Sequence, residues 1–239
     1  MGRDSRTRKR TVVLDFDDLC DGNDDMDTLK RLKERDDNFK VTLFAIPTRC
    51  GDELLAKYEA ERAWIQLGIH GWRHARYECL AWTSEETQEK LALSYKIYNH
   101  FAPIFKAPNW EICDEVYEGC AAAGVAVADH YRNIAILPEN VPHYMYNLRL
   151  RNDEFTRMHG HIQPYANTGL AEAYDTWASP PVGSEYRFVT DAVIPTKEIG
   201  LMPRTSSPAA TPKKKPSTKN YHYPYYGERG DIEWFGEKE

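Results

Sequence analysis

Short apolar runs alternate with amphipathic segments along most of this chain. Residues 11–16 form a β-branched apolar run typical of a buried strand. Residues 24–35 then carry apolar side chains at helical spacing, and residues 40–46 form a second strand-like run that Pro47 ends. Because strands that alternate with helices usually pair in parallel, the pattern predicts an α/β fold with a parallel sheet or barrel.

The same pattern predicts the remaining elements. We expect strands at residues 11–16, 40–46, 66–70, 104–107, 125–129, 155–159 and 187–193, and helices at residues 24–35, 52–64, 83–101 and 114–123. In the helix at 83–101, Ser84 is the expected N-cap and Pro103 is the expected stop. Gly124 stands just after a predicted helix, at a position that glycine favours.

Length and composition divide the chain into three parts. A chain of 239 residues has room for one core of barrel size and a tail, but little for two full domains. We expect a basic N-terminal arm at residues 1–10, the barrel at residues 11–200, and a Pro/Lys-rich linker with an aromatic tail at residues 201–239. The aromatic cluster of the tail could dock on the body, join copies into a homo-oligomer, or be only a sticky tail.

Charge and hydropathy exclude several classes of partner. A net charge of -6 gives no electrostatic footprint for nucleic acid, so no nucleic-acid partner is expected. No apolar run approaches the length of a membrane helix, and none of signal-peptide length follows the basic start. The 5 cysteines form no Cys-x-x-Cys motif, which indicates free thiols in a reducing compartment. We therefore expect a cytoplasmic protein without a membrane partner.

The first segment that carries chemistry is Asp15-Phe16-Asp17-Asp18, at the end of the first predicted strand. Carboxylates this close repel one another unless a cation or a basic group lies among them. The carboxyl ends of strands are where α/β folds bind ligands, so Asp17 and Asp18 are candidate functional residues. For the aspartates of residues 21–27 we prefer a solvated acidic turn.

The second segment is His70-Gly-Trp-Arg-His74. Two histidines four residues apart on one helical turn can face the same point and share a metal ion. The glutamate of a His-Glu-x-x-His metalloprotease is absent, because Gly71 follows His70. Together with Asp18, the two imidazoles would occupy three metal positions and leave room for water and substrate, as in a catalytic site.

The third segment, Arg157-Met-His159-Gly-His161, closes a late predicted strand. The two-residue period of a strand places His159 and His161 on one face. Either histidine could act as a general acid near neutral pH, and the alternative is a pair of surface histidines.

These segments occur in the order of a known family. The motifs are Phe16-Asp17-Asp18, His70-Gly-Trp-Arg-His74, Phe105-Lys106-Ala107-Pro108-Asn109-Trp110 and Met158-His159-Gly160-His161. In this order and at strand ends, they resemble the polysaccharide deacetylase family, also called carbohydrate esterase family 4 or the NodB-homology domain. The resemblance covers residues 11–161, and it implies a distorted (β/α) barrel.

The resemblance also implies roles for individual residues. Asp17 matches the catalytic base, and Asp18, His70 and His74 match the ligands of a divalent metal, commonly zinc. The other matching residues are the catalytic acid, His159 or His161, and the expected substrate contacts Lys106, Pro108, Asn109, Trp110 and Trp72. A backbone N–H of the Pro108 segment would stabilise an oxyanion. The implied reaction is hydrolysis of an N-acetyl group on a sugar-like substrate to a free amine and acetate.

The chain departs from the family pattern at several positions. Leu19 replaces a glycine, Lys106 replaces an arginine that orients the base, and Asn109 replaces an aromatic residue. Lysine cannot hold a carboxylate in the bidentate way that arginine does. An Asp-x-x-Trp partner for the catalytic histidine is missing, although Asp129 lies at a plausible strand end. These changes indicate a divergent branch.

Three alternatives to the sugar deacetylase follow from these departures and from the ligand types. One is a hydrolase of a non-sugar amide or an O-acetyl ester on the same scaffold, and another is a catalytically silent binding protein. A set of two histidines and one carboxylate also suits non-haem iron oxygenases, but these use a double-stranded β-helix rather than alternating strands and helices. Since no export signal is visible, we expect a small or intracellular acetylated substrate.

Overall fold

The computed structural model describes residues 11–130, 142–146, 155–164, 169–172, 184–193, 225–226 and 232–233. The chain divides into two compact units, Met1–Gly200 and Leu201–Glu239. In the second unit, β9 (Tyr225–Tyr226) and β10 (Ile232–Glu233) pair antiparallel. The N-terminal arm and the linker at 203–219 lie outside the described residues, so the roles predicted for the arm and the tail stay predictions.

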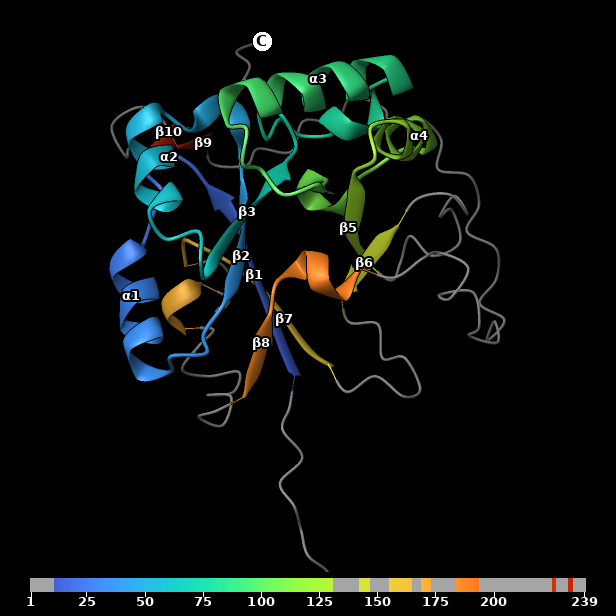
Figure 1. Ribbon diagram of the computed structural model, residues 1–239. Helices are drawn as coiled ribbons and strands as arrows, with labels where there is room; N and C mark the ends of the chain where they lie inside the picture. The colour runs from blue at the N-terminus through green and yellow to red at the C-terminus, as the bar shows by residue number, and fades with distance from the viewer. Residues whose placement is uncertain are drawn as a thin grey trace, which may run out of the picture. The chain divides into compact units, whose positions relative to one another are not determined.

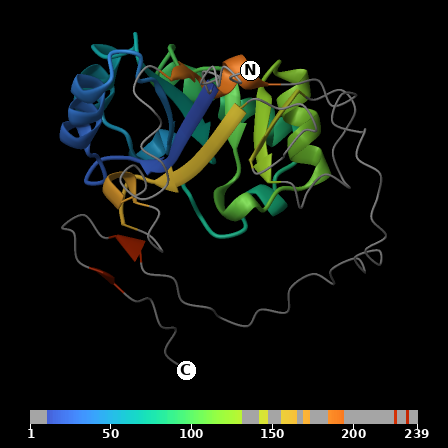
Figure 2. The same ribbon diagram turned by 90° about the horizontal axis from the view of Figure 1, so that it is seen from below.

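The first unit is built around one sheet of eight strands. The strands are β1 (Thr11–Leu19), β2 (Val41–Ala45), β3 (Ile65–His70), β4 (Ile104–Lys106), β5 (Ala126–His130), β6 (His143–Tyr146), β7 (Phe155–His161) and β8 (Glu185–Arg187). Their order is β6-β5-β4-β3-β2-β1-β7, with β8 also paired to β1, and every pair is parallel. In Figure 2, β1 and β7 lie side by side although they are far apart in sequence.

The longer α-helices of the described ranges lie around the outside of this curled sheet (Figure 1). They are α1 (Met26–Arg35), α2 (Asp52–Glu59), α3 (Ser84–Ile97) and α4 (Asp114–Ala122). Each lies between two parallel strands in the sequence, which is the crossover arrangement that the alternating pattern predicted. The α/β fold class, a distorted (β/α) barrel, is confirmed.

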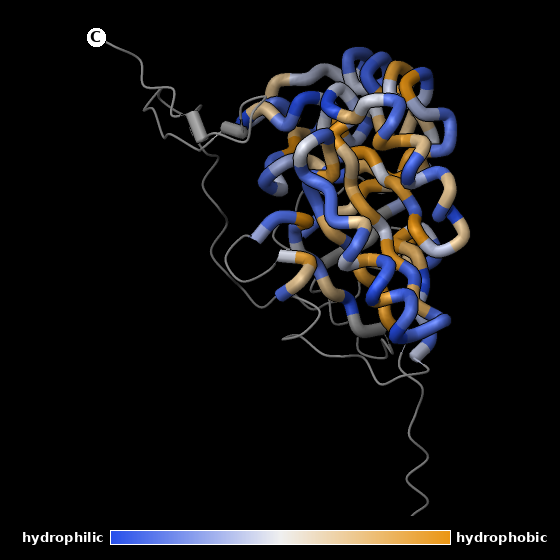
Figure 3. The backbone as a smooth tube through the Cα atoms, turned by 90° about the vertical axis from the view of Figure 1, so that its left-hand side faces the viewer, coloured by the Kyte–Doolittle hydropathy of each residue, from blue (hydrophilic) through white to orange (hydrophobic). Residues whose placement is uncertain are grey.

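The core lies between the strands and the helices. β2 is buried along its whole length, and β1 is buried except at Thr11 and Asp18. Figure 3 shows that hydrophobic segments gather in the interior of the folded body and hydrophilic segments at its periphery. Burial of a large aliphatic side chain contributes about 1.5–3 kcal/mol, so these strands stabilise the fold that positions their polar ends. No helix in the described ranges is both long and apolar enough to cross a membrane.

Helix boundaries differ from the prediction where side-chain caps decide them. Thr83, not Ser84, is the N-cap of α3, because its hydroxyl accepts from the Glu86 N–H while Glu86 accepts from the Thr83 N–H. The helix ends at Ile97, before Pro103 can act as a stop. The predicted helix at 52–64 ends at Glu59 and continues as turns.

The predicted strand at 187–193 is wrong. Only Glu185–Arg187 pairs with β1, and Val189–Ala192 forms a 3₁₀ helix. Side chains take the backbone donors that a strand would need for pairing: Phe188 N–H donates to Asp191, and Val189 N–H donates to Thr42 over 3.0 Å. The chain therefore turns away from the sheet at this point.

The acidic turn at residues 21–27 is also more than a solvated loop. The Asp25 side chain caps α1 by accepting from the Thr28 N–H, 3.1 Å away. Asp24 accepts from the Tyr58 hydroxyl and pairs with Lys57 at 2.5 Å, which ties the turn to α2. These aspartates are structural, and the two at the end of β1 remain to carry the chemistry.

Candidate metal and catalytic site

The functional candidates converge at the carboxyl ends of the strands. Asp17 and Asp18 lie near the end of β1, His70 ends β3, Lys106 ends β4 and His161 ends β7. Because all these strands are parallel, their ends lie at one edge of the sheet, where ligands bind in α/β folds.

A bulge at the end of β1 directs the side chains of the neighbouring Asp17 and Asp18 to different partners. Phe16 pairs with Leu43 and Leu19 pairs with Ala45, so β1 has one residue more than β2 in this interval. Within the bulge, Asp18 has a left-handed backbone with φ of 74°. A left-handed conformation costs free energy in a non-glycine residue and often marks a functional position. Here it brings the Asp18 carboxylate to the imidazoles.

Asp18, His70 and His74 form the first cluster of potential metal ligands, as predicted from the motifs. Asp18 Oδ1 lies 3.3 Å from His70 Nε2 and 3.0 Å from His74 Nε2. One carboxylate oxygen and two imidazole nitrogens are a ligand set suited to zinc and similar divalent ions. Three protein ligands leave further coordination positions for water or substrate.

The protonation of His70 fits a metal ligand. Its Nδ1 lies 3.0 Å from the carbonyl oxygen of Lys106, and a carbonyl only accepts, so Nδ1 carries the proton. Nε2 then presents a lone pair to Asp18, as in metal sites where a second partner fixes the histidine tautomer. Asp18 Oδ1 itself is buried and makes no hydrogen bond within the described part of the chain. A cation between these lone pairs would satisfy all three atoms.

The electrostatics of the cluster also favour a positive charge. Burial would raise the pKa of Asp18, but the close approach of His70 and His74 outweighs burial and holds that pKa well below its usual range. Burial would lower the pKa of His70, but Asp17 and Asp18 outweigh burial and raise it. The residues present therefore fit a divalent metal.

The segment from His70 to His74 is a loop rather than the helical turn that we predicted. Glu78 holds it: one carboxylate oxygen accepts from the N–H groups of Trp72 and His74, at 3.0 and 3.1 Å, and the other accepts from Arg73 at 3.1 Å. These donors therefore bond to a side chain instead of to helical carbonyls. The loop still brings the two imidazoles together, with ring centroids 4.9 Å apart.

The second oxygen of Asp18 is held from the other side. Gln163 donates to Asp18 Oδ2 over 2.7 Å, and Asn23 donates to the Asp18 carbonyl over 2.6 Å. The Asn23 amide also lies 2.6 Å from the Gln163 side-chain oxygen. These contacts orient Oδ1 toward the histidines, and sequence reasoning missed Glu78, Gln163 and Asn23.

Beside the first cluster lies a buried ion network centred on Lys106. Its ammonium nitrogen lies 2.5 Å from Asp15 Oδ1, 2.8 Å from Asp17 Oδ1 and 2.9 Å from His159 Nδ1. His159 Nδ1 also lies 2.8 Å from Asp15 Oδ1. Lys106 therefore bridges the carboxylates of Asp15 and Asp17. An arginine could instead bind one carboxylate through two parallel hydrogen bonds.

This network keeps Asp17 ionised. Burial would raise the pKa of Asp17, but the Lys106 ammonium and the neighbouring histidines, His159 foremost, lower it to about 2. Asp17 Oδ2 lies 3.7 Å from His159 Nε2 and 3.8 Å from His70 Nε2, between the two groups of residues. At neutral pH the carboxylate can accept a proton at this position.

His159 and His161 share a face of β7, as the two-residue period predicted. In the parallel register Asp15 pairs with His159 and Asp17 pairs with His161. His159 is buried, so the alternative of a surface histidine pair is wrong. Burial also lowers the pKa of His161, which keeps it neutral near pH 7.

The segment Pro108–Trp110 follows β4 as a short 3₁₀ turn, and left-handed backbones at Asn109 and Trp110 shape it. The Trp110 ring packs edge-on against His159, with centroids 5.1 Å apart, and lies 4.4 Å from the Lys106 ammonium. The segment therefore borders the proposed acid. Trp72 instead packs against the hydrophobic core, and its predicted contact with substrate, like that of Pro108, stays a prediction.

The carboxylate that contacts the proposed catalytic histidine is Asp15 rather than Asp129. Asp129 is engaged by the Tyr117 hydroxyl and by the His130 N–H, inside the fold. The carboxylate beside His159 is Asp15, which sequence reasoning passed over. The sequence signal that could have identified Asp15 is its two-residue spacing from Asp17, which places both side chains on the same face of one strand.

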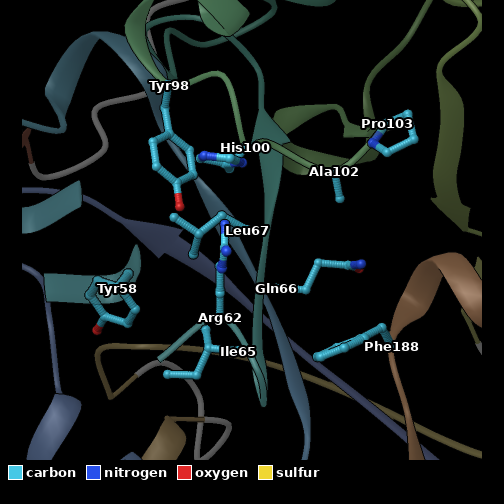
Figure 4. A pocket seen from close by; sticks show the side chains of 10 residues that line it. All are labelled: Tyr58, Arg62, Ile65, Gln66, Leu67, Tyr98, His100, Ala102, Pro103 and Phe188. Atoms are coloured by element: carbon cyan, nitrogen blue, oxygen red, sulfur yellow. The ribbon is translucent and has the colours of Figure 1, made fainter. Parts of the chain in front are cut away.

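A separate cavity of about 290 Å³ is lined by Ile65, Gln66 and Leu67 at the amino end of β3, together with side chains from neighbouring elements (Figure 4). Its polar groups have partners in the fold. The Tyr98 hydroxyl bonds to Glu59, and Gln66 bonds to Thr42 and Thr190. The predicted site residues lie at the other end of the sheet.

Comparisons with known proteins agree with the fold. A chitin deacetylase from the fungal pathogen Colletotrichum lindemuthianum superimposes with a TM-score of 0.50 at 15% sequence identity, covering 78% of this chain and 88% of that chain. A family 4 pseudoenzyme from Bacillus anthracis also gives 0.50 at 15% identity, covering 77% of this chain and 66% of that one. At these identities the likeness concerns the fold alone.

Among curated proteins no sequence matches this chain. The family model for polysaccharide deacetylase matches residues 4–130, more than half of the sequence. This span contains the aspartate pair of β1, the two histidines of the first cluster and the Pro108 segment. The chain therefore belongs to the polysaccharide deacetylase family.

Proposed function

We propose that this protein is a metal-dependent hydrolase that removes an N-acetyl group from a sugar or glycan-like substrate, releasing acetate and a free amine. One observation carries the proposal: the cluster of Asp18, His70 and His74 lies directly beside an ionised carboxylate, Asp17, and a buried imidazole, His159. Amide hydrolysis needs an electrophilic centre, a base for water and an acid for the departing nitrogen, and these groups fill those roles.

Asp18, His70 and His74 would hold the metal, zinc in our proposal. When bound there, a divalent metal supplies a Lewis acid that polarises the acetyl carbonyl and makes water more acidic. Asp17 would accept the proton from the attacking water, because its carboxylate is ionised and lies 3.8 Å from His70 Nε2. The Asn109 N–H is our candidate donor to the developing oxyanion.

His159 is the stronger candidate for the catalytic acid. Lys106 and Asp15 engage its Nδ1, and its Nε2 faces Asp17 Oδ2 at 3.7 Å. Asp15 and Lys106 are thus positioning residues, which fix the ring so that Nε2 can give a proton to the departing amine. His161 lies on the same strand face and remains the alternative acid.

Lys106 argues for an active enzyme rather than a silent binding protein. A lost arginine would leave the base without a partner, but the Lys106 ammonium lies 2.8 Å from Asp17 and is itself buried. Desolvating a lysine is costly unless carboxylates compensate it, and Asp15 and Asp17 do so here. The exchange of arginine for lysine therefore keeps a cationic partner beside the proposed base.

The test is acetate release from a panel of N-acetylated sugars, chitin oligosaccharides and O-acetylated xylan by the metal-reconstituted protein. Asp17→Asn is the comparison, and Asp27→Asn on the exposed surface of α1 is the matched control. Acetate from wild type and Asp27→Asn but not from Asp17→Asn supports the proposal. Release from the O-acetyl substrate alone would make the protein an esterase. No release from any substrate, with metal bound, would favour the binding protein.

A further inference from the structure

We propose that Asp17, His159 and His161 form a second, weaker divalent-metal site whose occupation blocks the reaction. The proposal goes beyond the deacetylase function, because the proposed reaction uses one metal and keeps these residues for proton transfer. One carboxylate oxygen and two imidazole nitrogens of this group lie within 4.8 Å of one another, as do the corresponding atoms of the first cluster.

Two neighbouring strands hold these donors in place. Asp17 is the register partner of His161 across the parallel pair of β1 and β7, and His159 lies two residues earlier on the same face. Asp17 Oδ2 and His159 Nε2 are 3.7 Å apart. Two ligands of one tetrahedral zinc lie about 3.3 Å apart, so these two donors need only a small side-chain adjustment, and the His161 imidazole must move by up to about 1.5 Å more.

The position of Lys106 allows this site. The ammonium contacts Oδ1 of Asp17 and Nδ1 of His159, at 2.8 and 2.9 Å. The atoms that would bind the metal are the other carboxylate oxygen and the other ring nitrogen of the same side chains. Asp15 lies 2.5 Å from the ammonium and compensates its charge. Lys106 thus holds Asp17 and His159 through the atoms that do not bind the metal, in the way that outer-shell partners orient metal ligands.

Charge balance makes the second site weaker than the first. The two neighbouring clusters together hold three carboxylates, those of Asp15, Asp17 and Asp18, and one ammonium, that of Lys106, so with neutral imidazoles a single divalent ion neutralises them. A second ion then enters without any excess negative charge to attract it and is repelled by the first. We expect a dissociation constant at least about tenfold higher for the second ion.

A metal ion in this second site would bind the same oxygen and nitrogen atoms that the proposed proton transfers use. A carboxylate oxygen bound to a metal no longer accepts a proton from water, and a metal-bound imidazole nitrogen no longer gives one. His161 supplies the third ligand of the second metal site, because Asp17 and His159 alone offer only two. High metal concentration would therefore inhibit the proposed reaction.

The experiment counts zinc ions bound to the full chain in equilibrium dialysis over a range of zinc concentrations. Wild type should bind one ion at low zinc and a second at higher zinc. His161→Ala and the closer mimic His161→Gln should bind only the first, with its affinity unchanged. His100→Ala, at a half-exposed histidine beside Glu59, is the control and should still bind two. Circular dichroism confirms that each variant is folded.

Saturation of wild type at one ion, or a second ion that persists in both folded His161 variants, would overturn the proposal. The dialysis needs no turnover, so a protein that releases no acetate leaves this result unaffected. Conversely, acetate release at one bound metal would stand even if no second ion binds.

Discussion

The backbone carbonyl oxygen of Lys106 accepts a hydrogen bond of 3.0 Å from Nδ1 of His70. The ammonium of the same lysine lies 2.8 Å from the carboxylate of Asp17. The last residue of β4 thus fixes the tautomer of a proposed metal ligand with its main chain and orients the proposed base with its side chain. In the proposed function, this one position of the sheet would couple metal binding to proton transfer.

Replacement of Lys106 by methionine should be strongly destabilising. It would leave Asp15 and Asp17 buried without their counter-charge, and breaking a buried ion pair costs about 3–5 kcal/mol. Lys57→Met breaks the partly exposed pair with Asp24 and should cost at most about 1 kcal/mol. Urea unfolding of both variants measures the difference. Equal losses in the two would mean that the Lys106 network contributes nothing beyond a surface pair.

Replacement of Gly71 by alanine should disturb the loop between the two histidines. Gly71 has φ of 58°, and an added Cβ would lie 2.1 Å from Glu78 Oε1 and 2.7 Å from Pro108 Cγ. Gly124 has φ of 69° but an added Cβ meets nothing within 4 Å, so Gly124→Ala isolates the backbone cost of about 1–2 kcal/mol. Gly71→Ala should lose more than this in urea unfolding and should also bind metal more weakly. A loss no larger than that of Gly124→Ala would contradict the close packing.

Replacement of Glu78 by glutamine should weaken metal binding more than folding. The carboxylate accepts from three successive N–H groups around His74, and an amide nitrogen in its place cannot accept. Loss of an outer partner typically lowers metal affinity about 10- to 100-fold. Glu86→Gln changes the capping box of α3, away from the site, and serves as the control in zinc titrations. Similar zinc affinity in both variants would show that Glu78 does not position the ligands.

Most of the sheet could be predicted from the sequence because strands such as β1 and β2 are local apolar runs with local stops, whereas β6 (His143–Tyr146) has no such run and was not predicted. The late strand at 187–193 failed because its backbone donors bond to side chains, one of them Thr42, far away in the sequence. Hydrogen bonds between the backbone and distant side chains leave no periodic pattern in the sequence. The same holds for the loop after His70, whose conformation depends on Glu78 rather than on helix propensity.

The candidate site was predicted from motif order, and its supporting contacts were not. Asp18 and the two histidines were found because the family resemblance places them together. Asp15 was missed because its partners, Lys106 and His159, lie 91 and 144 residues away in the chain. Only the parallel register of β1 with β7, together with the end of β4, brings these groups into contact.

The cysteines offer a test of the core that is independent of activity. All five are free, and four are buried, while Cys113 is half-buried. Burial raises the pKa of Cys120 far above its ordinary 9.0, so its reactive thiolate is absent from the native state near pH 8. With a thiol-reactive chromogenic disulfide, the native protein should show at most one readily labelled thiol, which Cys113→Ala removes, whereas the unfolded chain shows five.

The raised pKa of Cys120 also fixes the direction of a pH effect. A group whose native pKa lies above its unfolded value stabilises the fold fully below the unfolded pKa and loses that contribution as pH rises. The free energy of unfolding should therefore decline above pH 9.0, where the thiol ionises only in the unfolded chain. Cys120→Ala opens a small cavity but removes the pH-dependent contribution of this thiol, so the unfolding free energy of the variant should decline less steeply above that pH. An unchanged slope in Cys120→Ala would show that the thiol is not desolvated in solution.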